Sequence, residues 1–362
     1  MSLIEHADIV VVGAGPAGSL AAEHAALAGA RVLMLEKRPQ VGVPVRCGEF
    51  LPHLEEIKAI FPDAQDVEDI YQFPSDLEQV ETERLHIYSP KLRMSEVPFH
   101  GFTTERDRFD QHLAARAVKA GAELRTGVRV LGFKEGVLLT DHGDMRPKGL
   151  VGADGPLSVT AKSLGLERSK DLCPAIAGMV PGDFEPIPEM FFGNIAPGGY
   201  AWVIPKKNGA NVGLGYSTRY MEGPLNRHFD AFLGSRGLTV SDRYGKMVPM
   251  SGPISKTVVG NALVVGDAAS QVMAVNGGGI PIAIICGRIA GECAARTVRS
   301  GASLEEYERQ WRREVGGPLR TAARTKSLAS LSFGSQWRLE WAMRLLGVKG
   351  MGRAIRCQSV PF

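Results

Sequence analysis

Four absences limit what this 362-residue chain can be. Its five cysteines are scattered, with no Cys-x-x-Cys pair, so the sequence predicts no zinc or iron–sulfur site and no disulfide framework. No run approaches the roughly 18 uninterrupted apolar residues of a membrane span, and the N-terminus lacks a secretory signal pattern. The formal net charge of +3 is too small to indicate a nucleic-acid partner. We therefore expect a cytoplasmic protein that binds no metal and no nucleic acid.

The length and composition predict a globular chain of more than one lobe. With 362 residues the chain is longer than a usual domain of roughly 100 to 200 residues. Hydrophobic residues make up 44% and charged residues 22%, and both fractions are ordinary for a folded protein. We therefore expect the sequence to divide into at least two lobes.

Residues 7–37 have the pattern of a strand, a Gly-rich turn, a helix and a second strand: ADIVVVGAGPAGSLAAEHAALAGARVLMLEK. Gly13 allows the tight turn, Gly15 lets the backbone approach a pyrophosphate, and Gly18 lets the helix pack close to the strand. The phosphates would sit at the helix N-terminus, where free N–H groups and the helix dipole favour an anion. Glu36 ends the second strand and is placed to accept hydrogen bonds from a ribose. The motif predicts a dinucleotide site without choosing between NAD and FAD.

Two later segments favour FAD. LVGADGPLSVTAKSLGL (150–166) places Asp154 at the end of a strand, and NALVVGDAASQVMAVNGGGIPIAIICGRIAGECAA (261–295) has Asp267 after a strand and a Gly-rich turn that opens a long helix. These segments resemble the second and third signatures of the FAD-dependent glutathione-reductase-type fold, in its hydroxylase-like branch. The resemblance implies that Asp267 holds the ribityl chain of the flavin. It also implies that the long helix points its N-terminus at the flavin, where the helix dipole stabilises the negative charge of the reduced ring.

A third segment supports the same cofactor. TTERDRFDQHLAARAVKAGAELRTGVRV (103–130) predicts an amphipathic helix followed by a strand. Members of the fold family carry an Arg before Phe-Asp that approaches the FAD phosphates, and a backbone contact to adenine on the later strand. Arg106 and Val130 hold the matching positions. Taken alone, Arg106 would be read as a solvated charge at a helix end.

Two inserted stretches, about 59–100 and 173–253, lie between the FAD-binding segments. The second contains EMFFGN, GYAWVIP and NVGLGYS, with an Asn-Gly hairpin signal between the last two, and predicts an antiparallel sheet of at least three strands. Alternation along a strand puts Tyr200 and Trp202 on one face. That face could pack on a core helix. It could instead form the wall of a substrate chamber, because an apolar aromatic surface suits an apolar substrate.

The aromatic strand and a Cys near the N-terminus give a more specific match. The chain resembles the geranylgeranyl reductase family, whose members include archaeal enzymes that saturate the isoprenoid chains of membrane lipids. Members carry P-x-x-Y-x-W-x-(F/I)-P, and the residues at these places are Pro197, Tyr200, Trp202 and Pro205. They also carry a Cys just after the first βαβ unit, and PVRCGEFLP supplies Cys47. The resemblance spans residues 7 to about 300, with two departures: Phe50, where many members have Gly, and a Gly-rich turn without its usual proline.

The resemblance implies an α/β fold with a Rossmann-type FAD-binding domain of the hydroxylase-like branch, an inserted antiparallel-sheet substrate domain and a C-terminal helical region. The FAD-binding domain would comprise residues 1–58, 101–172 and 254–300, the substrate domain 59–100 and 173–253, and the helical region 301–362. The residues expected to bind FAD are Gly13, Gly15, Ala17, Gly18, Glu36, Arg46, Cys47, Gly48, Phe50, Arg106, Val130, Asp154, Asp267, Gly278, Gly279 and Ile280.

The reaction that the resemblance implies is hydride transfer from reduced FAD to an isolated C=C bond of a geranylgeranyl chain, with a proton added to the other carbon. An unconjugated alkene has no carbonyl to polarise, so positioning in a dry pocket must do most of the work. The expected catalytic residues are Cys47, as proton donor or as a gate beside the flavin, and Tyr200 and Trp202, which shape the chamber. Cys47 could equally be a small buried hydrophobe.

The electron donor and two other functions stay open. No second Gly-x-Gly-x-x-Gly motif is present, so electrons are expected from a ferredoxin-like carrier or from docked NAD(P)H. A flavin halogenase or monooxygenase would carry G-W-x-W-x-I-P, and this chain differs from that motif by Tyr200 in place of the first Trp. That Tyr and the RCGE segment favour the reductase. The third function is a non-catalytic flavin protein that binds isoprenoid or quinone lipids, which would have no need of a reducible flavin.

The C-terminal tail is basic and rich in large apolar residues. Residues 320–362 contain eight Lys or Arg and a single acid, Glu340. SQWRLEWAMRLLGVKGMGRAIR mixes Trp and Leu with those cations. Such a helix could lie on an anionic membrane surface and give the protein a peripheral membrane contact. It could equally pack on the body with its basic face in water.

Overall fold

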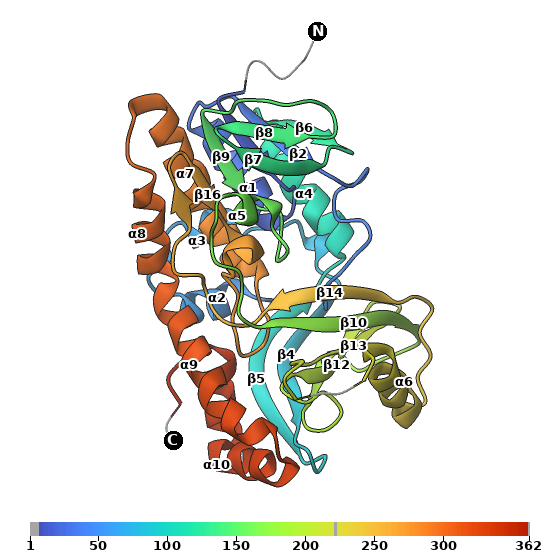
Figure 1. Ribbon diagram of the computed structural model, residues 1–362. Helices are drawn as coiled ribbons and strands as arrows, with labels where there is room; N and C mark the ends of the chain where they lie inside the picture. The colour runs from blue at the N-terminus through green and yellow to red at the C-terminus, as the bar shows by residue number, and fades with distance from the viewer. Residues whose placement is uncertain (1–6, 221–222, 361–362) are drawn as a thin grey trace.

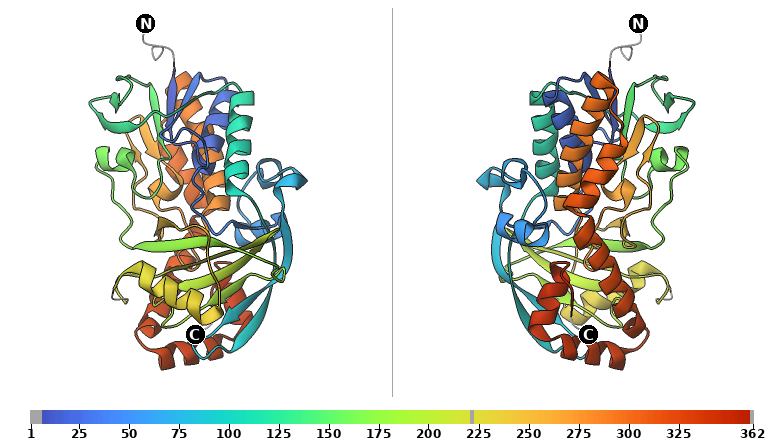
Figure 2. Two further views of the ribbon diagram at one scale, coloured as in Figure 1. Left: turned by 90° about the vertical axis from the view of Figure 1, so that its right-hand side faces the viewer. Right: turned by 90° about the vertical axis from the view of Figure 1, so that its left-hand side faces the viewer.

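The computed structural model describes residues 7–220 and 223–360 and contains two large sheets joined along one side by helices (Figure 1). The six-stranded sheet occupies the upper part of the view, and the eight-stranded sheet crosses the lower part. The C-terminal helices run down one side and pass both sheets (Figure 2). Among the described residues, none of the helices combines the length and the apolar character needed to cross a bilayer.

The six-stranded sheet is a Rossmann-type sheet. Its neighbouring strands are parallel except for the edge pair β15–β16. All four residues of the strand Ile9–Val12 are buried, as expected for a central strand that is covered on both faces. In spatial order the strands are β15 (Val258–Val259), β16 (Ala262–Val264), β9 (Gly149–Gly152), β1 (Ile9–Val12), β2 (Val32–Glu36) and β6 (Glu123–Thr126).

Helices cover one face of this sheet and a hairpin covers the other. Val11 packs in the cluster that includes α1 (Pro16–Leu27), α4 (Arg106–Lys119) and α7 (Ile280–Ser300). Val10 faces the opposite way, toward β7 (Val130–Lys134) and β8 (Val137–Thr140), beside the short helix α5 (Val159–Ser163). Gly287 and Gly291 let α7 lie directly on α1, because a Cβ at either position would come within 2.6 Å of the α1 backbone. This packing fixes the N-termini of α1 and α7 on the same side of the sheet.

The second sheet has eight strands and is antiparallel except for the pair β11–β4. The outer face of this sheet is covered by α6 (Leu225–Arg236). Lys207 and Asn208 form the turn between β12 and β13, where the sequence predicts a hairpin. In spatial order the strands are β14 (Tyr244–Pro249), β10 (Leu172–Pro181), β13 (Gly209–Gly215), β12 (Tyr200–Lys206), β11 (Glu189–Phe191), β4 (Val80–Tyr88), β5 (Met94–Thr103) and β3 (Phe50–Pro52).

The two faces of β12 serve different purposes. Ala201 and Val203 are buried in the core under α6. Tyr200 and Trp202 lie on the opposite face and are only partly buried. The alternation predicted from the sequence therefore places the aromatic pair on the side of the sheet that faces the Rossmann-type domain.

The segment after β3 packs differently from the expected division of the chain. It contains α2 (Leu54–Ile60), α3 (Val67–Ile70) and the 3-10 turn η1 (Ser75–Leu77). Ile60, Ile70 and Leu77 belong to the same hydrophobic cluster as α1 and α4, although residues 59–100 are expected in the substrate domain. Conversely, β3 pairs with β5 in the second sheet, although residues 1–58 are expected in the FAD-binding domain. By packing, β3 therefore belongs to the second sheet, whereas the short helices that follow it belong to the core of the first domain. Their apolar faces could have been buried in either core.

The expected C-terminal helical region is present. It consists of α8 (Glu305–Glu314), α9 (Gly316–Phe333) and α10 (Gln336–Ile355). A buried ion pair between Arg288 Nη2 and Glu314 Oε2, 2.6 Å apart, joins α7 to α8. Met343 and Met351 of α10 pack with Val97 of β5. The helices therefore link the two sheets.

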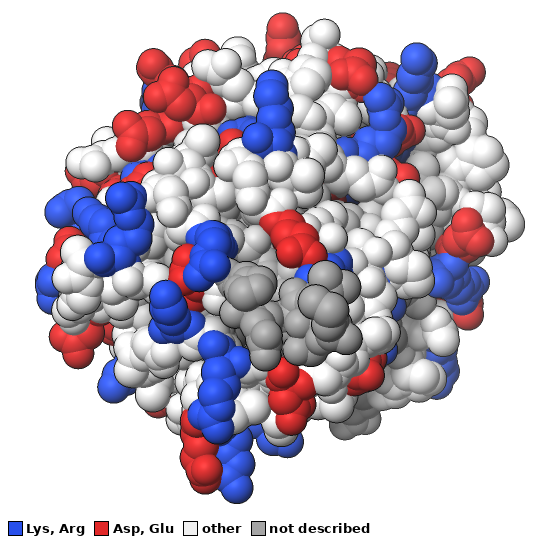
Figure 3. All heavy atoms as spheres, turned by 90° about the horizontal axis from the view of Figure 1, so that it is seen from above, with Lys and Arg blue, Asp and Glu red and all other residues white. Residues whose placement is uncertain are grey.

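Acidic and basic side chains are interspersed on the face above the six-stranded sheet (Figure 3). The chain has 42 Lys and Arg against 39 Asp and Glu, so this mixture agrees with its balanced composition. The charged side chains that affect the candidate site lie inside a cavity between the two sheets.

Candidate functional site

A cavity of about 750 Å³ lies between the two sheets and is lined by both. The first domain contributes the Gly-rich turns, and the second contributes the aromatic pair of β12 and part of β14. With one exception, Gly18, every residue expected to be catalytic or to bind FAD lines this cavity: Gly13, Gly15, Ala17, Glu36, Arg46, Cys47, Gly48, Phe50, Arg106, Val130, Asp154, Tyr200, Trp202, Asp267, Gly278, Gly279 and Ile280. Segments that are far apart in the sequence thus meet in one space.

The three glycines of the first turn differ in what surrounds them. A Cβ on Gly13, whose φ is +101°, would lie 2.4 Å from the carbonyl oxygen of Ala153. A Cβ on Gly18 would lie 1.9 Å from the carbonyl oxygen of Gly13, so Gly18 serves the close packing of helix and turn. A Cβ on Gly15 would meet no atom within 4 Å. Gly15 therefore faces open space at the N-terminus of α1, which no side chain caps, and this cradle fits a pyrophosphate.

Glu36 lies at the edge of the same cradle. Its two carboxylate oxygens accept hydrogen bonds from the backbone N–H groups of Ala14 (3.1 Å) and Arg38 (3.0 Å). These bonds hold the carboxylate at the end of β2 and leave further lone pairs available, because each carboxylate oxygen can accept more than one hydrogen bond. The position is suitable for binding a ribose diol.

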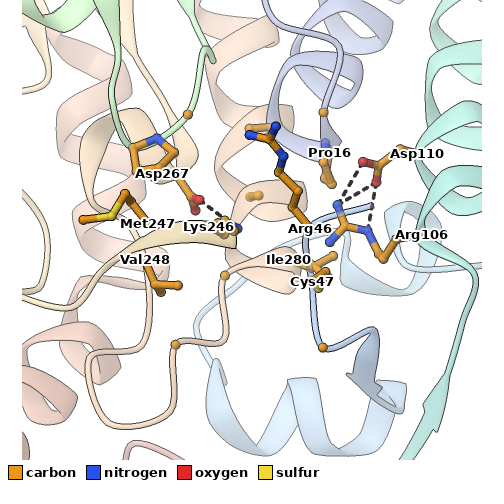
Figure 4. Close-up of a pocket in the computed structure, with 18 of the residues that line it drawn as sticks. Pro16, Arg46, Cys47, Arg106, Asp110, Lys246, Met247, Val248, Asp267 and Ile280 are labelled. Atoms are coloured by element: carbon orange, nitrogen blue, oxygen red, sulfur yellow. Dashed lines mark hydrogen bonds and ion pairs between the residues drawn. The ribbon is translucent and has the colours of Figure 1, made fainter. Parts of the chain in front are cut away.

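Asp267 lies on the 3-10 turn η2 (Gly266–Ala269), near the N-terminus of α7. Its Oδ2 is 3.2 Å from the Nζ of Lys246 on β14, and Figure 4 shows the pair inside the cavity. The Asp267 carboxylate is the main reason that the pKa of Lys246 is raised, and this effect outweighs the burial of the ammonium group. Lys246 is not among the site residues predicted from the sequence. The one feature of the sequence that could have indicated it is a basic residue among the mainly apolar residues of β14.

Two expected cofactor residues are already engaged by protein groups. The Asp154 carboxylate accepts hydrogen bonds from Ser158 Oγ (2.5 Å) and from the backbone N–H of Thr160 (3.0 Å), and so holds the start of α5. The Arg106 guanidinium donates to both oxygens of Asp110, one helical turn away, at 2.8 and 2.9 Å (Figure 4). Both residues line the cavity, but most of their polar capacity is used within the protein.

The Cys47 sulfur interacts electrostatically with two cations of the cavity, Arg106 and Lys246. The same sulfur accepts a hydrogen bond from the backbone N–H of Glu49 at 3.2 Å. Burial opposes the charge of Arg106, but Asp110 and the Cys47 sulfur outweigh it and raise the pKa of Arg106. Figure 4 also shows Arg46, the neighbour of Cys47, extending into the cavity.

Cys47 differs from the other cysteines in its exposure. Cys47 is partly buried, whereas Cys173, Cys286, Cys293 and Cys357 are buried. Burial raises the pKa of Cys173 and of Cys357 to about 12. Among the described residues there is no group of three His, Cys, Asp or Glu side chains that could hold a metal.

The aromatic wall consists of Tyr200 and Trp202, whose ring centroids are 5.9 Å apart. The Tyr200 hydroxyl donates to the carbonyl oxygen of Asn276, in the Gly-rich turn before α7, at 2.5 Å. Burial, and to a smaller extent Cys47, raises the pKa of Tyr200. The Trp202 indole N–H donates to Asn211 Oδ1 at 2.9 Å. Both polar tips are thus bound by protein groups, and the rings present apolar surface to the cavity.

Beyond the aromatic wall the cavity is lined mainly by apolar side chains. They come from β4, β5, β11, α6 and the end of α10, namely Leu85, Phe99, Met190, Leu225 and Ile355. A chamber with this lining favours an apolar ligand. The site therefore joins a polar, Gly-rich end that suits a dinucleotide to an apolar end that suits a hydrocarbon chain.

Comparisons with known proteins agree with both ends of the site. The family model for the geranylgeranyl reductase catalytic domain matches residues 181–251, and that for an NAD(P)-binding Rossmann-like domain matches residues 11–56. A digeranylgeranylglycerophospholipid reductase of Methanocaldococcus jannaschii is 34% identical over 334 residues, which cover 84% of this chain and 82% of the relative. The same-named protein of Methanosarcina acetivorans is 37% identical over 343 residues and covers 85% and 81%.

Solved structures confirm the expected fold class. A geranylgeranyl bacteriochlorophyll reductase-like protein of Thermoplasma acidophilum has a TM-score of 0.85 and 28% identity, covering 97% of this chain and 96% of its own. The flavin-dependent brominase Bmp2 has a TM-score of 0.75 at 18% identity, covering 97% and 94%, and shows a likeness of fold alone. The match to a Rossmann-like domain indicates that the Gly-rich end of the site binds a dinucleotide cofactor.

Proposed function

The chain belongs to the geranylgeranyl reductase family, and we propose that it saturates isolated C=C bonds in the geranylgeranyl chains of a phospholipid precursor, with FAD as its flavin. It is an oxidoreductase that acts on geranylgeranyl groups. One observation supports the proposed substrate: a single cavity extends from the Gly-rich turns past the aromatic wall to the apolar lining beyond it. A hydrocarbon chain can lie in the apolar end while its double bond reaches the dinucleotide end.

The residues of the polar end fit FAD. Gly15 and the N-terminus of α1 would hold the pyrophosphate, Glu36 the adenosine ribose, Asp267 the ribityl chain and Gly279 the flavin ring. When bound, the flavin supplies the hydride to the alkene. The N-terminus of α7 and the Lys246 ammonium add positive potential at this end of the cavity, where negative charge is stabilised.

Cys47 is the proposed proton donor. Cys47 lines the cavity, and Arg106 and Lys246 interact electrostatically with its sulfur. Positive charge on these two side chains stabilises the negative charge left on sulfur after the proton moves to the alkene carbon. Tyr200 and Trp202 orient the chain by contact and exclude water, which an unpolarised alkene requires.

Reductase activity requires an electron donor, and we propose a separate ferredoxin-like carrier or NAD(P)H that docks briefly. Within the described residues the Gly-x-Gly-x-x-Gly turn occurs once, at the start of α1. The rate of flavin reduction is measured with each donor in turn. The donor that serves the enzyme should reduce the flavin at least as fast as the enzyme turns over. Equal failure of both would overturn this part of the proposal.

The experiment that tests the proposed function measures the mass of the product. The purified protein, reduced with dithionite under argon, is incubated with a digeranylgeranylglycerophospholipid and the lipid is analysed by mass spectrometry. We expect a gain of two hydrogens per reduced double bond. A product that forms only when oxygen is admitted would point instead to monooxygenase or halogenase chemistry. Lipid that is bound but unchanged would point to a carrier.

We also propose that the outer face of α10 and the end of α9 contact an anionic bilayer from which the lipid is taken. Trp337, Trp341 and Leu345 are 65%, 47% and 83% exposed, so large apolar side chains face solvent there. They alternate with basic residues such as Arg344, which lies over the Trp341 ring. The opposite face of α10 packs on β5, and its C-terminal residue Ile355 lines the cavity. A helix face that is both apolar and basic suits a lipid surface.

Sedimentation with vesicles tests this contact. The variant Trp337→Ser/Trp341→Ser/Leu345→Ser changes only exposed side chains and should keep the fold. Leu27→Ser/Leu131→Ser is the matched control, because these residues are 66% and 56% exposed on the other domain. We expect the wild type and the control to sediment with phosphatidylglycerol vesicles and the triple variant to stay largely in the supernatant. Equal sedimentation of all three proteins would contradict the contact.

A further inference from the structure

A cluster of polar side chains lies directly behind the aromatic wall and bonds to the loop that carries Cys47. Its members come from three separate parts of the chain: Glu49, Lys206, Asn211 and Tyr244. Asn211 has no exposed surface, and Glu49 and Lys206 are 5% and 9% exposed. A buried polar side chain that loses its partner costs about 1–3 kcal/mol, so each member of this cluster depends on the hydrogen bonds of the others.

Asn211 connects the wall to the loop that carries Cys47. Its amide nitrogen donates to the carbonyl oxygen of Cys47 at 2.9 Å and to Glu49 Oε2 at 3.1 Å. Its amide oxygen accepts the hydrogen bond from the Trp202 indole at 2.9 Å. One side chain therefore sets the position of the Cys47 backbone relative to the indole ring.

The strand around Asn211 leaves room for this arrangement. Gly213 is opposite Trp202 in the β12–β13 register, and a Cβ on Gly213 would lie 2.3 Å from the indole. On the cavity side of β13, Asn211 is followed by two glycines, whereas Ala210, Val212 and Leu214 face α6. The indole can therefore lie over the strand and reach the Asn211 amide.

The other members of the cluster hold the loop from its second side. Glu49 has a left-handed backbone (φ +64°), which is uncommon for a residue other than glycine. Its Oε1 accepts from the backbone N–H of Arg106 at 3.0 Å and lies 3.3 Å from Lys206 Nζ. Lys206 Nζ also donates to the carbonyl oxygen of Thr104, whose N–H donates back to the Glu49 carbonyl. The ion pair and these backbone bonds keep the loop in a conformation that it would not adopt alone.

We propose that Asn211 is a positioning residue for the reduction. By holding the Cys47 carbonyl and the Trp202 indole at once, it sets where the Cys47 thiol lies relative to the surface on which the alkene rests. This inference rests on the proposed role of Cys47 as proton donor. The Asn211→Ala variant should leave the flavin bound and the apolar lining intact, while the thiol loses its fixed orientation.

Alkylation of Cys47 tests the positioning without any need for turnover. The other four cysteines are buried, so iodoacetamide applied to the native holoprotein reports on Cys47, and peptide mass spectrometry verifies the site. We expect Asn211→Ala to raise the alkylation rate about threefold or more, because the freed loop opens more often. Asn261→Ala is the matched control: its side chain also donates to a backbone carbonyl, that of Lys148 at 2.6 Å, but at the protein surface. It should react like the wild type.

Turnover supplies the second measurement. For Asn211→Ala we expect kcat to fall about tenfold with little change in KM, because a misplaced group lowers the rate of the chemical step while binding to the apolar chamber persists. Tyr244→Phe, which removes the hydroxyl 2.6 Å from the Asn211 amide nitrogen, should shift both measurements in the same direction by a smaller factor and serves if Asn211→Ala does not fold.

The outcomes separate this inference from the proposed function. Wild-type alkylation and kcat in Asn211→Ala and in Tyr244→Phe would overturn the positioning role. A Cys47→Ser variant with full turnover would overturn the role of the thiol, and the positioning in this reaction with it. Faster alkylation alongside that result would still place Asn211 as the link that holds the loop.

Discussion

The two ends of the cavity are built in different ways. At the dinucleotide end the decisive features belong to the backbone: Gly18 has no room for a side chain, and Gly15 leaves space at a helix N-terminus. At the aromatic end they belong to side chains from separate segments, where Cys47, Trp202 and Asn211 meet through hydrogen bonds. A backbone site is defined by a local motif, whereas a side-chain site exists only once the fold has brought its members together.

This difference predicts how each end fails. A substitution in the glycine turn should damage folding or cofactor binding, because the backbone itself must move. A substitution at the aromatic end should leave the flavin in place and change the reaction. Substitutions at Gly18 and Cys47 test this division, and a substitution at Asp8, which does not line the cavity, should have the smallest effect.

Gly18→Ala should be the most damaging single change. The new Cβ would lie 1.9 Å from the Gly13 carbonyl oxygen, so the turn and α1 must separate, at a cost of about 3 kcal/mol or more. We expect an unstable protein without flavin. Gly15→Ala is the matched comparison, since its Cβ would meet no protein atom, and it should fold normally but bind flavin more weakly. Thermal melting and flavin absorbance measure both effects, and equal stability of the two variants would contradict this account.

Cys47→Ser should separate cofactor binding from reaction. The variant is expected to keep its yellow flavin and its stability but to lose about a hundredfold in kcat, a usual contribution for a positioned proton donor. Cys293→Ser is a suitable control, because this sulfur lies away from the cavity beside Arg296 and Gln310. Single-turnover reoxidation of the reduced flavin by the lipid measures the rate. Unchanged turnover would remove Cys47 from the mechanism.

Asp8→Asn should affect stability slightly and the reaction not at all. Arg31 and Lys148 hold the pKa of Asp8 well below its ordinary value of 3.8, against the effect of burial. A lowered pKa stabilises the fold above the ordinary value, and the contribution is lost as pH falls toward the lowered one. Because both cations are largely exposed, we expect only about 0.5–1 kcal/mol at pH 7.

Denaturation at several pH values checks the sign. The difference in free energy of unfolding between wild type and Asp8→Asn should be constant from pH 7 down to about pH 5 and shrink below pH 4. A difference that grows as the pH falls would show that the pKa of Asp8 is not lowered in the folded protein.

The sequence was informative where the chemistry is local. The glycine turn, the position of Glu36 at the end of β2 and the alternation of β12 could be predicted, because each depends on residues that are close in the chain. The expected roles of Asp267, Cys47 and Trp202 came from resemblance and not from spacing, and more than 150 residues separate Cys47 from Trp202.

The sequence was uninformative where side chains meet across the fold. Lys246 and Asn211 each looked like a single polar residue in an apolar strand, and their partners Asp267 and Cys47 lie on other elements. Arg106 was expected to approach phosphates, but its strongest partner is Asp110, only four residues along the helix. That pair could have been read from the sequence, because residues four apart on a helix are neighbours.

The measurement that tests the central claim most directly is an anaerobic stopped-flow experiment on the flavin. Dithionite-reduced protein is mixed with a digeranylgeranylglycerophospholipid, and the flavin absorbance is followed with oxygen excluded. If the polar and apolar ends form one site for alkene reduction, the flavin should reoxidise in the presence of the lipid and not with its fully saturated analogue. Flavin that stays reduced with both lipids until air is admitted would contradict the account.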